Sequence, residues 1–135
     1  MKRLTAEWVR KAEADFLAAQ KLVSGSAPLH DAVCFHCQQA AEKYLKAQLV
    51  ELGLAVPRTH NLIALLPLLV PHYRSLRRFR RGLDFLTRFA VETRYPGESA
   101  TKRQAASARR WAAEVRDACR TLLGLGPASR PRKRP

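Results

Sequence analysis

Residues 29–52 read LHDAVCFHCQQAAEKYLKAQLVEL, and this stretch decides the fold. Phe35, Leu45 and Leu49 lie on related faces at helical spacing, which is the repeat of an α-helix that buries one side. Gly53 follows the stretch, and glycine commonly ends helices because it adopts the left-handed conformation without strain. The sequence therefore predicts one long helix over about residues 29–52.

Four further helical segments flank this helix. The same apolar repeat predicts helices over about residues 5–23, 75–93 and 99–123. A short apolar run over residues 62–70 predicts a buried helix that Pro67 bends or shortens. Segments rich in Ser, Gly and Pro separate the helices, and no alternation of apolar and polar residues is long enough for a sheet. The predicted fold class is all-α: an antiparallel four-helix bundle with a short extra helix.

Length and composition predict a single domain followed by a tail. The chain has 135 residues, of which 47% are hydrophobic, and this suffices for one packed core. We expect a helical domain over residues 1–125 and a basic, Pro-rich, disordered tail over residues 126–135. The sequence has no run of 18 apolar residues and no signal-peptide pattern, so we expect a cytoplasmic protein that does not bind a membrane.

The chain carries a large excess of positive charge, because 25 Lys and Arg residues stand against 11 Asp and Glu, for a formal net charge of +14. Such an excess attracts nucleic acid, nucleotide phosphates or an acidic protein partner. Along the predicted helix over residues 75–93, apolar side chains form one face and arginines the other. The arginines predict contacts to a nucleic-acid backbone, with a solvated cationic face as the alternative. The residues concerned are Arg74, Arg77, Arg78 and Arg81.

The cysteines do not indicate a disulfide framework, because their number is odd and Cys34 and Cys37 fall on one helix. With His30 they lie at positions i, i+4 and i+7, which would present three ligands to zinc. A fourth ligand is not evident, and a small buried cysteine is ordinary in a core. We therefore predict reduced thiols and no metal. No cofactor is expected either, since the chain lacks a Gly-rich phosphate loop, a Ser-His-Asp arrangement and a paired-carboxylate site.

A polar stripe crosses the long predicted helix. Its members are spaced three, four and three residues apart and therefore share one face. They are His36, Gln39, Lys43 and Lys46. Glu42 lies four residues before Lys46, which allows an ion pair. The stripe is either a solvated face with an ion pair or a groove that recognises phosphate or another subunit.

Three polar positions outside this helix are predicted to contact other parts of the chain. Thr59 is able to cap the short apolar helix that follows it. His60 is predicted to bond either a backbone carbonyl or the polar stripe. Asp15, among the apolar neighbours of the first helix, is predicted to pair with Lys43 or Arg94.

Several pieces of sequence, in a fixed order, carry a family resemblance. The pieces are Trp8, Ala12 and Asp15, then AVCFHCQQAAEKYLKAQL over residues 32–49, then Thr59-His60-Asn61-Leu62, and last Arg94-Tyr95-Pro96. Together they resemble the HEPN domain, named for nucleotide-binding proteins of higher eukaryotes and prokaryotes, over about residues 5–124. The combination Gln-Gln-Ala-Ala-Glu-Lys followed by Leu-Lys-Ala is fairly specific to that family.

The resemblance implies an antiparallel four-helix core with a short additional helix, frequently in a homodimer. It also implies a minimal nucleotidyltransferase encoded nearby, with which the protein acts in a toxin-antitoxin-like pair. Many family members are metal-independent ribonucleases that use an Arg and a His separated by four to six residues. None of the four histidines here follows an arginine at that spacing. An enzyme is therefore not the preferred prediction.

The hypothesis that results is a protein that binds a nucleotide or RNA, or a nucleotidyltransferase partner. Its predicted ligand-binding groove consists of His36, Gln39, Lys43, Lys46, His60 and Arg94. The alternative is a metal-independent ribonuclease toxin with a divergent active site. That site would consist of His60, Arg94 and Tyr95. A third interpretation, a general polyanion-binding protein, predicts an affinity that falls steeply with salt.

Overall fold

The computed structural model describes residues 1–27, 29–90 and 96–127. All regular secondary structure in these ranges is helical, which confirms the predicted all-α class. In chain order the elements are α1 (Arg3–Ser24), α2 (His30–Glu51), α3 (Leu62–Leu69), the 3-10 helix η1 (Arg74–Phe79), α4 (Arg80–Thr87) and α5 (Lys102–Leu122). Arg94 and Tyr95, which belong to the predicted groove and to the alternative active site, lie outside the described residues, as does the tail from residue 128.

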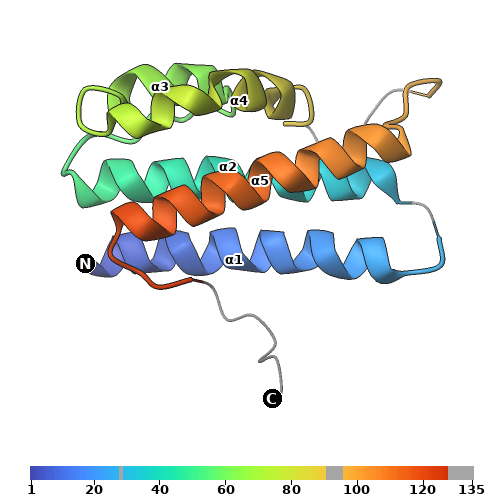
Figure 1. Cartoon of the computed structure of the whole chain (residues 1–135), viewed down its shortest axis with the longest axis horizontal. Coiled ribbons are helices and arrows are strands. Elements are labelled where there is room, and N and C mark those ends of the chain that lie inside the picture. Colours follow the sequence, from blue (N-terminus) through green and yellow to red (C-terminus); the bar gives the residue numbers. More distant parts are fainter. Residues whose placement is uncertain (28, 91–95, 128–135) are drawn as a thin grey trace, which may run out of the picture.

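Helix α2 lies at the centre of the bundle. Helix α1 packs along one side of it, α5 crosses it, and α3, η1 and α4 form a layer on the remaining side (Figure 1). Ala40, Ala41 and Ala47 of α2 are at most 1% exposed, and their small side chains let the neighbouring helices approach closely. The observed bounds agree with the helix predicted from residues 29–52. Gly53 follows with a φ of +74°, which confirms the predicted glycine stop.

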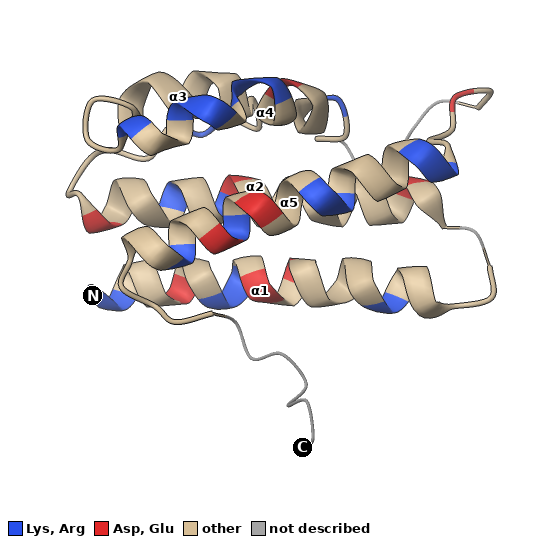
Figure 2. Ribbon diagram, in the orientation of Figure 1, with Lys and Arg blue, Asp and Glu red and all other residues tan. Residues whose placement is uncertain are grey.

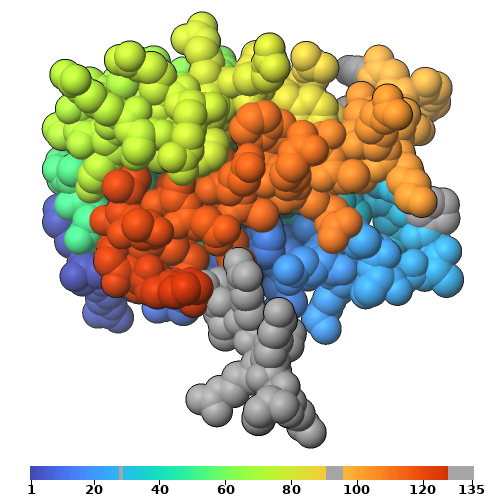
Figure 3. Space-filling model, viewed as in Figure 1, coloured from blue at the N-terminus to red at the C-terminus, as the bar shows by residue number. Residues whose placement is uncertain are grey.

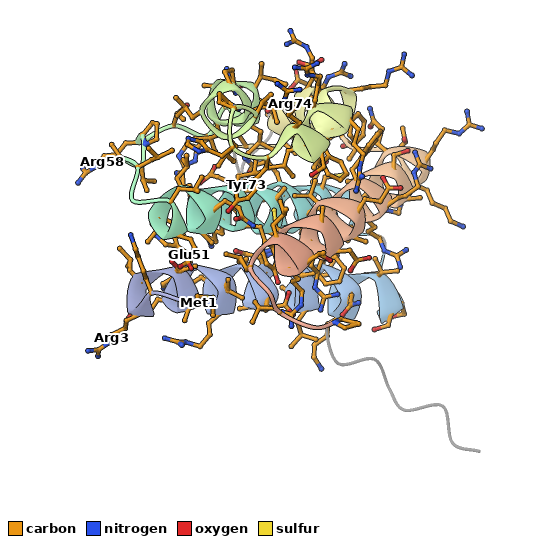
Figure 4. The ribbon with its side chains drawn as sticks, turned by 60° about the vertical axis from the view of Figure 1, so that its left-hand side comes forward. Met1, Arg3, Glu51, Arg58, Tyr73 and Arg74 are labelled. Atoms are coloured by element: carbon orange, nitrogen blue, oxygen red, sulfur yellow. The ribbon has the colours of Figure 1, made fainter. Side chains whose placement is uncertain are left out.

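The end of α2 is tied to the start of α1. The Glu51 carboxylate accepts the backbone N–H of Lys2 at 3.0 Å and the Thr5 hydroxyl at 2.9 Å. These hydrogen bonds pull the pKa of Glu51 below its usual value. Figure 4 shows Glu51 between the two helices, close to Met1. The first turn of α1 therefore has a fixed position on the bundle.

Asn61 caps the N-terminus of α3, whereas the sequence indicated Thr59 as the capping residue. The Asn61 side-chain oxygen accepts the N–H of Ile63 at 3.0 Å, while the Thr59 hydroxyl accepts the N–H of Asn61 itself at 3.1 Å. A second restraint comes from α4, because the Thr87 hydroxyl oxygen accepts the N–H of Leu62 at 3.1 Å. Helix α3 is thus joined at its first residue to α4.

The single helix predicted over residues 75–93 is not observed as such. The segment begins as the 3-10 helix η1 and becomes α-helical only in α4, which ends at Thr87. Several arginines lie three or four residues apart here, and like charges at that spacing destabilise a regular α-helix. The predicted end of the helix, residues 91–93, lies outside the described ranges.

A cluster of polar side chains joins α1, α2 and α5. The Glu13 carboxylate accepts two hydrogen bonds from Arg116, at 2.6 and 2.7 Å, and a third from the Tyr44 hydroxyl. Burial alone would raise the pKa of Glu13, but the bonds from Arg116 and Tyr44 outweigh it and lower that pKa. Burial raises the pKa of the Tyr44 hydroxyl, so this group remains a donor. The cluster fixes three helices relative to one another.

We predict that Gly82→Ala destabilises the protein. A Cβ at Gly82 would lie 2.2 Å from ring atoms Cδ2 and Cε3 of Trp111, so α4 and α5 would have to move apart. Overpacking of this kind costs about 1–3 kcal/mol, more than the gain of about 0.5–1 kcal/mol from the higher helix propensity of alanine. Urea unfolding measures the denaturation midpoint, which should fall. A higher midpoint for Gly82→Ala would contradict the close packing of Gly82 against Trp111. In a Trp111→Ala background the same substitution should instead stabilise the protein.

We also predict that Glu13 makes stability depend on pH. Because its pKa is lowered in the folded state, the stabilisation is present above its ordinary value of 4.5 and is lost as the pH falls below that value. Glu13→Gln should cost about 1–2 kcal/mol at pH 7, and the difference from the unmodified protein should shrink on acidification. Urea unfolding at several pH values measures this. Glu98→Gln, at an exposed position, is the control; a constant difference would contradict the assignment.

Candidate functional site

The polar stripe predicted on α2 does not face solvent as a whole. It continues into two adjacent groups of hydrogen-bonded polar side chains from α1, α2 and the segment before α3, which together we call the polar seam. Its members are Asp15, His36, Gln38, Gln39, Glu42, Lys43, Lys46 and His60. Five of the six residues predicted for the ligand groove therefore come together, and the sixth, Arg94, lies outside the described residues.

One half of the polar seam is centred on Asp15 of α1. Its carboxylate pairs with the Lys43 ammonium, one of the two partners predicted from the sequence, and accepts a hydrogen bond from His36 Nδ1 at 2.8 Å. A carboxylate only accepts, so the Nδ1 of His36 carries a proton and Nε2 remains for other contacts. All three side chains are partly buried. Asp15 thus holds both side chains of α2 against α1.

The other half is centred on Glu42 of α2. Its carboxylate accepts from Lys46 Nζ at 3.1 Å, which confirms the predicted i, i+4 ion pair. It also accepts from His60 Nδ1 at 2.9 Å, so His60 bonds the polar stripe, one of the two predicted options. The Glu42 and Lys46 side chains are only 4% and 8% exposed, whereas that of His60 is 66% exposed. His60 is the open end of an otherwise buried charge cluster.

Two glutamines extend the Glu42 half along α2. Gln39 Nε2 donates to Gln38 Oε1 at 2.7 Å, and Gln38 Nε2 donates to Glu42 at 3.2 Å and to the backbone carbonyl of His60 at 3.1 Å. Gln38 is fully buried and was not among the predicted site residues. Its spacing of four residues from Glu42, and of eight from Lys46, was the available signal, because i, i+4 and i+8 lie on one helical face.

The polar seam has little unused positive charge. Its two ammonium groups and two imidazoles each bond one of the two carboxylates, Asp15 or Glu42. A phosphate bound here would have to compete with carboxylates that are already desolvated and well placed. The geometry therefore favours a role in holding α1 and the segment before α3 against α2.

The arginines of η1 and α4 have the opposite environment. We call the four predicted backbone contacts, Arg74, Arg77, Arg78 and Arg81, the cationic face. All four are exposed, and across residues 1–27, 29–90 and 96–127 none of them forms an ion pair. Figure 2 shows Lys and Arg positions along this layer and on the neighbouring α5. These guanidinium groups are available to an external anion.

The opposite side of the same segment confirms the predicted amphipathic pattern. Leu76, Phe79, Leu83 and Leu86 are all buried. The guanidinium of Arg78 lies 4.7 Å from the centroid of the Phe79 ring, a cation–π distance. Arg3 and Arg58 also point away from the protein (Figure 4). The apolar face of the segment anchors the cationic face to the core.

A cavity of about 720 Å³ adjoins the cationic face, between η1 and the C-terminal half of α5. Figure 3 shows the side chains of these two segments meeting along one border of the molecule. Arg78 and Phe79 line the cavity from η1, and Trp111 and Glu114 line it from α5. The cationic face therefore continues into a concave, partly aromatic surface.

No metal centre is evident, since the described residues contain no group of three or more His, Cys, Asp or Glu side chains placed to hold an ion. Cys34 and Cys37 are both buried in the core. Burial raises the pKa of Cys37 to about 12, so its thiol keeps the proton and is a poor ligand.

Within the described residues, every helix is too short or too polar to span a lipid bilayer.

Comparison with known proteins agrees with this architecture. A search of curated proteins gives no match. One solved structure, that of TT1696 from Thermus thermophilus, is similar with a TM-score of 0.63 and 27% sequence identity, over 92% of this chain and 95% of that one. The family model of the HEPN domain matches residues 5–122. Because that match spans nearly all of the helical bundle, the chain belongs to the HEPN domain family.

Proposed function

We propose that this HEPN-family protein binds RNA through the sugar-phosphate backbone, with the cationic face as its contact surface. One observation carries the proposal: the four guanidinium groups of that face are exposed and have no carboxylate partner in the described ranges. The cationic groups of the polar seam, in contrast, each bond Asp15 or Glu42. Phosphate oxygens therefore meet less competition at η1 and α4 than at the polar seam.

The physical chemistry of arginine supports this choice of ligand. A guanidinium group is always charged and presents a planar fork of donors that fits phosphate oxygens. Contacts to the backbone release bound counterions, so they give affinity with little sequence preference and a strong dependence on salt. The net charge of +14 adds a long-range attraction that speeds association with a polyanion.

The same face would also fit an acidic surface of a protein partner. The family resemblance makes a minimal nucleotidyltransferase, in a toxin-antitoxin-like pair, the partner to test first, and a second copy of this chain the next. In this proposal the polar seam keeps the bundle rigid beneath the contact surface. A phosphate bound in the seam itself would have to share Lys43 with Asp15 or Lys46 with Glu42.

A second candidate function is metal-independent RNA cleavage. The observation that favours it is that His36 and His60 each bond a carboxylate through Nδ1, which leaves Nε2 for proton transfer. His60 is largely exposed. Arg94 and Tyr95, the other residues of this hypothesis, lie outside the described residues. The binding function is preferred because no arginine at the family's spacing accompanies either histidine.

We predict that Arg77→Ala combined with Arg81→Ala weakens RNA binding and its salt dependence together. Each phosphate contact to single-stranded RNA contributes about 0.7 to the slope of log affinity against log salt, so the slope should fall by about 1.4. Fluorescence anisotropy of a labelled oligouridine at several salt concentrations measures both quantities. The matched control is Arg10→Ala with Lys11→Ala, two exposed cations on α1. An unchanged slope, or an equal loss in the control, would refute the proposed surface.

A cleavage assay separates the two candidate functions. Purified protein incubated with single-stranded RNA and EDTA should leave the RNA intact, since the proposed function is binding alone. Denaturing electrophoresis over several hours gives the readout. Cleavage that is abolished by His60→Ala, His36→Ala or Arg94→Ala, while RNA affinity is retained, would replace the binding function by the ribonuclease.

A further inference from the structure

We infer that the cavity between η1 and α5 is a base-binding site, which takes one unpaired guanine of an RNA strand whose backbone lies on the cationic face. This inference rests on the proposed RNA binding and adds a recognition element to it. The cavity volume of about 720 Å³ falls in the range of about 300–1,000 Å³ that is usual for small-ligand pockets. It therefore has room for a nucleoside.

The small side chain of Ala118 on α5 leaves room for the cavity. Trp111, Ala118 and Leu122 recur along one face of the helix, and all three line the cavity. Ala118 lies between two large side chains, so its missing bulk leaves a hollow next to the indole ring. Opposite it, η1 supplies Ser75 and Arg78.

Trp111 provides the stacking surface. Its ring packs against α4 so closely that a Cβ on Gly82 would lie 2.2 Å away, which fixes the orientation of the indole. The ring is only partly buried and lines the cavity. Unpaired bases of RNA stack on such aromatic rings, and a ring that is already fixed loses little entropy on binding.

The charges that line the cavity are separated in a way that orients a nucleotide. Arg78 lies on the η1 side, next to the rest of the cationic face, whereas Glu114 and Asp117 lie on the α5 side. Neither carboxylate forms an ion pair within the described residues. A phosphate is attracted to the first side and repelled from the second. The strand should therefore enter with its backbone toward Arg78 and its base toward α5.

The two carboxylates also select the base. A carboxylate accepts hydrogen bonds only, so it matches a base edge that presents donors. The Watson–Crick edge of guanine presents two adjacent donors, N1–H and N2–H, which a single carboxylate accepts together. Adenine and cytosine present one amino group beside an acceptor, and uracil presents one N–H between two acceptors. Glu114 or Asp117 therefore favours guanine.

The test compares oligonucleotides that differ at one position. An octamer of uridine with a single central guanosine should bind about tenfold tighter than the same octamer with an abasic residue there, which corresponds to about 1.4 kcal/mol. All-uridine RNA should fall between the two. In a Trp8→Phe protein, Trp111 is the remaining tryptophan, and its fluorescence should be quenched by the guanosine octamer. Binding is followed by anisotropy at fixed salt.

Two substitutions test the base site and its preference for guanine separately. Ala118→Leu adds bulk on the α5 side of the cavity and leaves all four arginines of the cationic face in place, so it should lower the affinity for the guanosine octamer to that of the abasic one and leave the latter unchanged. Glu114→Gln should reduce the preference for guanosine over uridine while quenching persists. Thermal unfolding checks that both variants are folded.

Failure of the base site and failure of the proposed RNA binding give different results. Equal affinity for the guanosine and abasic octamers, with normal salt dependence, would overturn the base site and leave the RNA-binding function intact. Absence of binding to every octamer would overturn both. If instead an arginine-rich peptide quenches Trp111, and Ala118→Leu prevents this, the cavity belongs to a cationic protein partner and the inference is wrong.

Discussion

The buried Glu42 carboxylate requires hydrogen-bond partners from two parts of the chain, and this requirement holds the segment before α3 against α2. Glu42 is 3% exposed, and a charge so far from water is stable only when it has close partners. Lys46 of the same helix, His60 of the next segment and the Gln38 amide provide them. Because His60 precedes α3 directly, this cluster holds the start of the α3–η1–α4 layer on α2. The buried apolar side of η1 and α4 completes the attachment of the cationic face to the core.

The same constraint divides the positive charges of the protein into two populations. Those on α2 are committed to carboxylates within the fold, and their release would leave Asp15 or Glu42 buried without partners. Those on η1 and α4 remain in solvent, where a polyanion gains their charge without breaking an internal pair. A bound polyanion would also relieve the mutual repulsion that a net charge of +14 imposes on a small domain. We therefore propose that a ligand uses cations that the fold itself does not need.

The sequence predicted those structural features that depend on residues a few positions apart. The helix of residues 30–51, its glycine stop and the Glu42–Lys46 pair all follow from positions a few residues apart. The Asp15–Lys43 pair was also anticipated, because a lone carboxylate on an apolar helix face needs a cation. The break between η1 and α4 was not predicted. The cavity at Ala118 was not predicted either, because it depends on how η1 packs against α5.

The central claim is that RNA contacts the cationic face and not the polar seam. Side-chain NMR of the arginine Nε–H and lysine Nζ groups during an RNA titration tests it most directly. The account predicts shifted resonances for Arg74, Arg77, Arg78 and Arg81, with Lys43 and Lys46 unchanged. Shifts confined to Lys43 and Lys46, with the four arginines unaffected, would contradict it.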